Sequence, residues 1–369
     1  MVVRGGYGIY YSPEIGTLTF NHRVSAYPWN IPQTFNADAT RPNIFLSDPF
    51  PDALALSSIT TSAIPTDFRH GYMQNWSLSI QRPLGTDTVL DVGYVGSKGT
   101  KMLTSRDINQ PFLGPGSIDS RRPIPGWSGI TMRERTSNSN YHSMQTKIER
   151  RFAGGLTFVS AYTLAHSIDD DSPNQDFYNR SADRGDSSFD VRHRLVNSYS
   201  YELPFGPGKR FLSQAGGVVS KIFGGWQLAG ITTFSTGQSI TPMVSGDISL
   251  TGKSSVRANR VGDGVLARDQ RNASRWFDTS AFVIPATGTF GNAGRNTLKA
   301  PGLNNWDVTL TKNTRIGENH RTEFRVEFFN ALNHAQFALP NTTVNSSAFG
   351  TITRAKDGRQ IQFGLKLYY

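Results

Sequence analysis

The end of the chain alternates between apolar and polar side chains up to its final residue. Ile361, Phe363, Leu365, Leu367 and Tyr369 fall on one face of an extended segment, and the residues between them fall on the other. Side chains in a strand alternate faces with a period of two, so this segment predicts a strand with one apolar and one mixed face. Chain ends usually fray unless something holds them, so a pattern kept to the last residue indicates a paired strand. An amphipathic strand of a soluble sandwich fits this segment alone as well as a membrane strand does.

Nine further segments have strand character, and most are about as long as the last one. The ten expected strands are Val2–Tyr11, Tyr72–Arg82, Asp87–Gly96, Tyr141–Phe152, Gly155–His166, Val191–Glu202, Trp226–Gly237, Asn305–Asn313, Arg321–Ala331 and Gly358–Tyr369. A strand of roughly eleven residues rises about 36 Å, and tilted by ~45° it spans about 25 Å, the height of the apolar band of a membrane barrel. Strands of globular proteins average nearer five or six residues, so the length favours a barrel.

The connections between these segments alternate in length, as they do in outer-membrane barrels with short periplasmic turns and long external loops. The short connections are Pro83–Thr86, Ala153–Gly154 and Thr314–His320. The long connections are Ser12–Gly71, Ser97–Asn140, Ser167–Asp190, Gln238–Asn304 and Leu332–Asp357. Leu203–Gly225 is the exception, because it is long where a turn is expected, and its apolar stretch Val218–Phe223 predicts a small helix.

Composition narrows the remaining classes. No run of 18 apolar residues exists, which excludes a transmembrane helix and leaves a β-barrel as the way to span a membrane. Cysteine is absent, so disulfides and thiolate chemistry are excluded. The net charge of +10 comes from scattered basic residues without a nucleic-acid motif, so we expect no nucleic-acid partner. The N-terminus lacks signal-peptide features, which leaves either a cytoplasmic chain or the downstream piece of a longer one.

Several stretches resemble a known family. They are Met73–Arg82, Val92–Gly99, Asn140–Gln145, Ala161–Ser167, Asp190–Arg194, Gly224–Leu228 and Glu327–His334. These residues resemble the C-terminal part of the β-barrel of TonB-dependent outer-membrane receptors, specifically the Oar-like group, and the likeness runs over nearly the whole chain. Phe363, Leu365, Leu367 and Tyr369 also resemble the signal that the outer-membrane barrel assembly machinery reads.

The resemblance implies an all-β fold, a partial antiparallel transmembrane β-barrel, with residues 1–369 forming a C-terminal section in contact with outer-membrane lipid. Complete receptors have roughly 22 strands, a plug domain, a TonB-contacting segment and a signal peptide, and Oar-like members usually add a carboxypeptidase-regulatory-like domain. None of these parts is visible, so we expect a fragment that meets the TonB complex only through missing N-terminal parts. A free-standing barrel of ten strands is the alternative.

Candidate sites are few. The chain has no HExxH, GxSxG, P-loop or GxGxxG motif, so we expect no enzyme, no catalytic residue and no cofactor. The segment Ser167–Asp190 is rich in carboxylates, which either bind a cation such as Ca²⁺ or pair with the interleaved Arg180, Arg184 and Arg192. EF-hand spacing is not met, which favours the ion pairs. The carboxylates are Asp169, Asp170, Asp171, Asp176, Asp183, Asp186 and Asp190.

A second polar group is expected on the lumen wall, where strand alternation directs Lys147, Glu149, Glu323, Arg325 and Glu327 inward. They would contact a plug or form cross-strand ion pairs.

Three functional hypotheses follow. The first is the barrel section of a TonB-dependent transporter that takes up a substrate the sequence does not identify. The second is a structural or adhesive outer-membrane barrel whose loops bind surface polysaccharide or protein. The third is a secreted soluble β-sandwich that binds carbohydrate.

Overall fold

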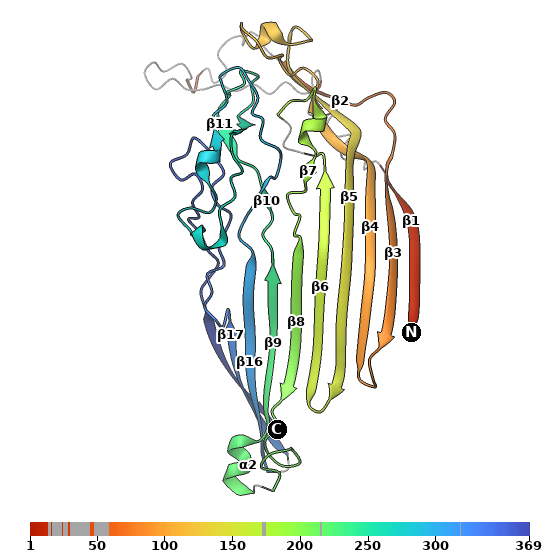
Figure 1. Cartoon of the computed structure of the whole chain (residues 1–369), viewed down its shortest axis with the longest axis vertical. Helices are drawn as coiled ribbons and strands as arrows, with labels where there is room; N and C mark the ends of the chain where they lie inside the picture. The colour runs from red at the N-terminus through yellow and green to blue at the C-terminus, as the bar shows by residue number, and fades with distance from the viewer. Residues whose placement is uncertain are drawn as a thin grey trace.

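One antiparallel sheet forms most of the protein, as a computed structural model shows (Figure 1). The structure describes residues 1–13, 59–171, 175–214, 216–317 and 319–369, together with the isolated residues 16, 24, 29 and 45–47. Neighbouring strands of the sheet follow one another in sequence order. They are β1 (Val2–Ser12), β3 (Gly71–Pro83), β4 (Thr88–Asp107), β5 (Trp127–Ala153), β6 (Leu156–Asp169), β8 (His193–Glu202), β9 (Trp226–Ser235), β16 (Leu303–Ile316), β17 (His320–Phe329) and β18 (Gln360–Tyr368).

All ten expected strands are therefore confirmed. Two short strands join the sheet at its sides, since β2 (Ile59–Ala63) pairs in parallel with β5, and β7 (Gly185–Asp186) pairs with β6. The part of the long connection Ser12–Gly71 that precedes β2 lies largely outside the described residues.

The prediction of a long loop over Ser97–Asn140 is wrong for most of that range. Strands β4 and β5 continue pairing from Ser97 opposite Tyr141 to Asp107 opposite Thr131, with a shift in register between Gly99 and Leu103. This extension carries polar side chains on both faces. Above an apolar band both faces of a hairpin meet water, so nothing requires the alternation by which the lower part was recognised.

The short connections lie at one end of the sheet. Gly85, Gly154 and Gly317 adopt positive φ there, which residues with a Cβ rarely do. Figure 1 shows both chain termini at this same end, together with α2 (Gly217–Phe223), which confirms the helix expected near Val218–Phe223. Within the described residues no helix is long and apolar enough to cross a membrane.

The register gives the sheet one apolar and one polar face. Leu78 lies opposite Tyr94, and Val326 lies opposite Phe363. Polar residues flank Leu78 and Val326 along their strands, namely Ser77 and Ser79, and Arg325 and Glu327. No protein layer covers the apolar face of β18 in the described part of the chain, where Phe363 is 68% and Leu365 is 72% exposed. The other sheets among these residues have two strands each, so they contain no second sheet of the kind that a sandwich requires.

A hydrophobic core is found instead in the long connection between β9 and β16. We call residues 238–302 the cap; it contains β10 (Ser239–Ile240), β11 (Met243–Ser245), β12 (Ser255–Arg257), β13 (Asn259–Arg260), β14 (Phe282–Val283) and β15 (Leu298–Lys299). Val244, Val256 and Phe282 are almost fully buried in the cap. Phe349, from the loop between β17 and β18, packs against this core. The cap lies toward the end of the sheet that carries the long loops (Figure 1).

Candidate functional site

The polar face of the sheet carries the charged residues that were expected there. Arg325 donates to Glu323 at 2.7 Å and lies 3.6 Å from Glu327, and Lys147 donates to Glu149 at 2.9 Å. Each pair joins residues two apart on one strand, so the expectation of cross-strand pairs is not met for these groups. The reason is geometric, because residues two apart on a strand point to the same side and long side chains reach that far.

We call residues 167–190 the Asp-rich segment, and its carboxylates do not gather at one point. Asp170 accepts hydrogen bonds from the Ser137 hydroxyl at 2.6 Å and from the Asn138 amide at 2.7 Å, both on β5. Asp171 accepts from Thr104 at 3.3 Å. Asp176 accepts from the amide of Tyr178 at 2.9 Å, a contact within its own turn. These three therefore fix the segment to β4, to β5 and to itself.

The other carboxylates of the segment contact the cap. Asp183 pairs with Arg257 at 2.6 Å, and the side chains are 0% and 3% exposed respectively. Asp169 pairs with Arg295, whose guanidinium also donates to the main-chain oxygen of Asp183 at 3.1 Å. The main chain at position 185 can approach the cap this closely because residue 185 is glycine; a Cβ there would lie 2.7 Å from the carbonyl oxygen of Arg295.

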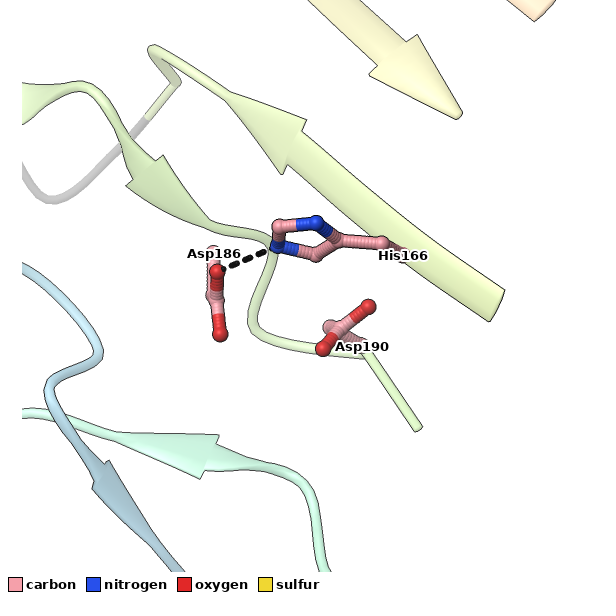
Figure 2. A group of neighbouring side chains, drawn as sticks. All are labelled: His166, Asp186 and Asp190. Atoms are coloured by element: carbon pink, nitrogen blue, oxygen red, sulfur yellow. Dashed lines mark hydrogen bonds and ion pairs between the residues drawn. The ribbon is translucent and has the colours of Figure 1, made fainter. Parts of the chain in front are cut away.

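Asp186 and Asp190 form a third contact with the cap, through Lys299. His166 of β6 lies beside the two carboxylates (Figure 2). His166 Nε2 lies 2.8 Å from Asp186, and the ammonium of Lys299 lies 2.8 Å from Asp186 and 3.3 Å from Asp190. Burial opposes ionisation of Asp186, but hydrogen bonds from Lys299 and His166 hold the pKa of this carboxyl below its usual range.

This His–Asp–Asp group is the arrangement among the described residues that comes nearest to a metal site, because its ligand atoms lie within 4.8 Å of one another. Lys299 already supplies a positive charge to both carboxylates. A divalent cation would have to displace that ammonium, so the chemistry of the group favours an ion-pair junction.

The sequence identified the acidic residues of these ion pairs but not most of their basic partners. Of the arginines expected to pair, Arg180 lies 3.8 Å from Asp170 and 3.6 Å from Glu134. Arg184 and Arg192 form no ion pair within the described residues. The main partners are Arg257, Arg295 and Lys299 of the cap, which lie 74 to 126 residues away from their carboxylates. No local spacing marks them in the sequence.

The four residues that resemble an assembly signal lie on or beside the edge strand β18. Phe363, Leu365, Leu367 and Tyr369 are all exposed on the apolar side. One edge of β18 pairs with β17, while the other pairs with no strand in the described part of the chain.

Among solved structures, one outer membrane transporter shows the same fold. The outer membrane transporter YddB from Escherichia coli matches with a TM-score of 0.50 at 10% identity, over 99% of this chain and 38% of that one. FpvA of P. aeruginosa bound to heterologous pyoverdines matches over 99% of this chain and 30% of its own, with 11% identity and a TM-score of 0.42. The FrpB iron transporter of Neisseria meningitidis matches over 84% and 33%, with 11% identity and a TM-score of 0.40. The chain thus spans about two fifths or less of the length of these proteins.

No curated protein matches the chain. Residues 1–362, in contrast, match the family model of the outer membrane beta barrel domain. This match and the sheet of ten long strands locate the protein in the outer membrane of a Gram-negative cell. The chain belongs to the outer membrane β-barrel domain family.

Proposed function

We propose that the chain is the C-terminal barrel section of a TonB-dependent receptor of the Oar-like kind, and that it takes part in substrate uptake rather than in catalysis. The observation that carries this proposal is the meander of ten long antiparallel strands with one apolar and one polar face. Its likeness to a transporter barrel over 99% of the chain supports it. The polar face would line the passage, and upstream parts of the receptor would supply the plug and the contact with TonB.

We infer two roles for residues of this section. The apolar residues Phe363, Leu365, Leu367 and Tyr369 would present the free edge of the last strand to the barrel assembly machinery. The Asp-rich segment would act as a brace, because its carboxylates already have protein partners on β4, on β5 and in the cap. Binding of Ca²⁺ by Asp169, Asp170, Asp171, Asp176, Asp186 or Asp190 is the competing interpretation.

The uptake proposal is tested by disrupting the chromosomal gene in the organism that carries it and measuring which medium compounds the cells deplete. We expect one group of compounds to stay in the medium of the disrupted strain, and the same group to stay in the medium of a strain without TonB. Reintroduction of the complete reading frame should restore depletion. Identical depletion by all strains across a wide panel of media would contradict the proposal.

A chelator experiment separates the two interpretations of the Asp-rich segment. If the segment is a brace, protease cleavage between residues 169 and 190 should be unchanged by EGTA and by added Ca²⁺. Faster cleavage in EGTA that Ca²⁺ reverses would show a bound cation instead.

A further inference from the structure

A cavity of about 550 Å³ lies between the extended hairpin of β4 and β5 and the cap. The strand residues that line it include Thr104 and Arg133. The cap contributes Lys253 and Ser255 from the loop and strand of the β11–β12 hairpin, and Phe177 comes from the Asp-rich segment. Three parts of the chain that are far apart in sequence therefore meet around one space.

The first cation of this cavity is Lys253. Its ammonium lies 3.7 Å from the centre of the Phe177 ring and forms no ion pair with a described carboxylate. Burial lowers the pKa of Lys253, although Asp107 and Asp183 at longer range act in the opposite direction. An ammonium has three donors, so a half-buried one that faces a ring is left with unused hydrogen-bonding capacity.

The second cation is Arg133. Its Nε is buried without a hydrogen-bond partner, and its guanidinium forms no ion pair within the described residues. The carboxylate among the cavity's described lining residues, Asp171, accepts from Thr104 and lies beyond ion-pair distance of both cations. Two positive charges and one carboxylate thus line the cavity, and the carboxylate lies beyond ion-pair distance of both cations.

The walls of the cavity are fixed by hydrogen bonds between side chains and the main chain. The fully buried Gln110 accepts from the amide of Phe177 at 2.8 Å, which holds the residue whose ring contacts Lys253. On the other side, Asp247 accepts from the amides of Thr251 at 2.9 Å and Gly252 at 2.7 Å, just before Lys253. Preformed cationic donors of this kind bind an anion without a large cost for ordering the protein.

We propose that this cavity is a binding site for an anionic group, a carboxylate or a phosphate, held by Lys253 and Arg133. The hydroxyls of Ser105, Ser254 and Ser255 line the same space and offer further donors. Leu103, Met243 and Phe177 provide apolar surface for the remainder of an organic ligand. The site is defined by the cap, the hairpin and the Asp-rich segment of this chain, so it stands whether or not the chain takes part in uptake.

The proposal is tested by competitive acetylation of lysines at pH 8 on the purified chain in detergent micelles, with mass spectrometry of the peptides. The probes are citrate, inorganic phosphate and solubilised lipid A, each compared with sodium chloride at equal ionic strength. A bound anion raises the pKa of Lys253, and each unit of that rise slows its labelling about tenfold. The exposed Lys356 should be unaffected.

Variants separate the site from general screening by salt. Arg133→Gln should weaken protection of Lys253 about tenfold in anion concentration, whereas the matched change Arg268→Gln, at an exposed cap residue, should leave it unchanged. Saturable protection by citrate or phosphate supports a soluble anion, and protection by lipid A alone supports the same cavity with a lipid source. Equal labelling of Lys253 with every probe, or equal protection of Lys253 and Lys356, would overturn the proposal.

Discussion

Replacement of Arg257 by methionine should open the contact between the cap and the Asp-rich segment. The change leaves the carboxylate of Asp183 buried and unpaired, and its Oδ2 already has no hydrogen-bond partner. Removing one member of a buried ion pair costs about 3–5 kcal/mol, which corresponds to roughly a 150- to 5,000-fold increase in the opening equilibrium. Arg295 still donates to the main chain of Asp183, so we expect the lower end of this range.

The assay is hydrogen exchange of peptides that cover residues 180–186 and 256–260, measured in detergent micelles at neutral pH. The control is Arg275→Met, which removes an exposed pair with Asp278 at 2.8 Å. Exposed pairs contribute about 1 kcal/mol or less, so exchange in the control should rise by roughly fivefold at most. An increase for Arg257→Met that is no larger than that of the control would refute the reasoning.

The pH dependence of Arg257→Met provides a second check. Burial raises the pKa of Asp183 even while Arg257 is beside it, and loss of the arginine raises it further. A carboxyl whose pKa is higher in the folded than in the unfolded state destabilises the fold fully above the folded pKa, and this penalty decreases as the pH falls from the folded to the unfolded pKa. The excess exchange should therefore decrease as the pH falls through the raised pKa, and Asp183→Asn in the variant should reduce it at neutral pH.

Two further predictions concern packing in the sheet and the acid sensitivity of the ion pair between Asp186 and Lys299. Gly96→Ala would bring a Cβ to 2.3 Å from the indole of Trp76 and should destabilise the barrel by about 1–3 kcal/mol in urea unfolding. Gly93→Ala is the control, because the atom nearest to its Cβ would lie at 3.4 Å, and it should leave the stability unchanged. Equal urea midpoints for the two variants would contradict this packing. Because the pKa of Asp186 is lowered in the fold, its contribution to stability is present above the unfolded pKa and is lost as the pH falls through the folded pKa. Lys299→Met should raise that folded pKa, so hydrogen exchange of residues 185–190 induced by acid should begin at a higher pH. An unchanged onset would argue against the contact between Lys299 and Asp186.

The strands could be predicted because the pattern that defines them is local. In the membrane part, lipid on one side and water on the other impose a period of two on every strand, as in the run from Thr322 to Phe328 opposite β18. The upper part of β4 and β5 was missed because both faces are wet there and the period disappears. The strands of the cap are two or three residues long, which is shorter than any pattern that periodicity can detect.

The ion pairs between the Asp-rich segment and the cap could be predicted only in part. The acidic residues are clustered and therefore visible, but Asp169 pairs with Arg295, which lies 126 positions further along the sequence. With 38 lysines and arginines in the chain, charge alone does not select the partner. The choice is made by the fold of the cap, whose core of Val244, Val256 and Phe282 brings Arg257 to Asp183. The cationic cavity is likewise formed by three distant segments.

The central claim, that the apolar face of the sheet meets lipid and the polar face meets water, is tested most directly along β17. The chain has no cysteine, so single cysteines can be placed at each position of Glu323–Phe328 and spin-labelled in lipid bilayers without background. Accessibility to oxygen should be high at Phe324, Val326 and Phe328, and accessibility to a water-soluble nickel reagent should be high at the alternate positions. Loss of this period of two, with every label equally accessible to the nickel reagent, would contradict the assignment of β17 to a membrane barrel.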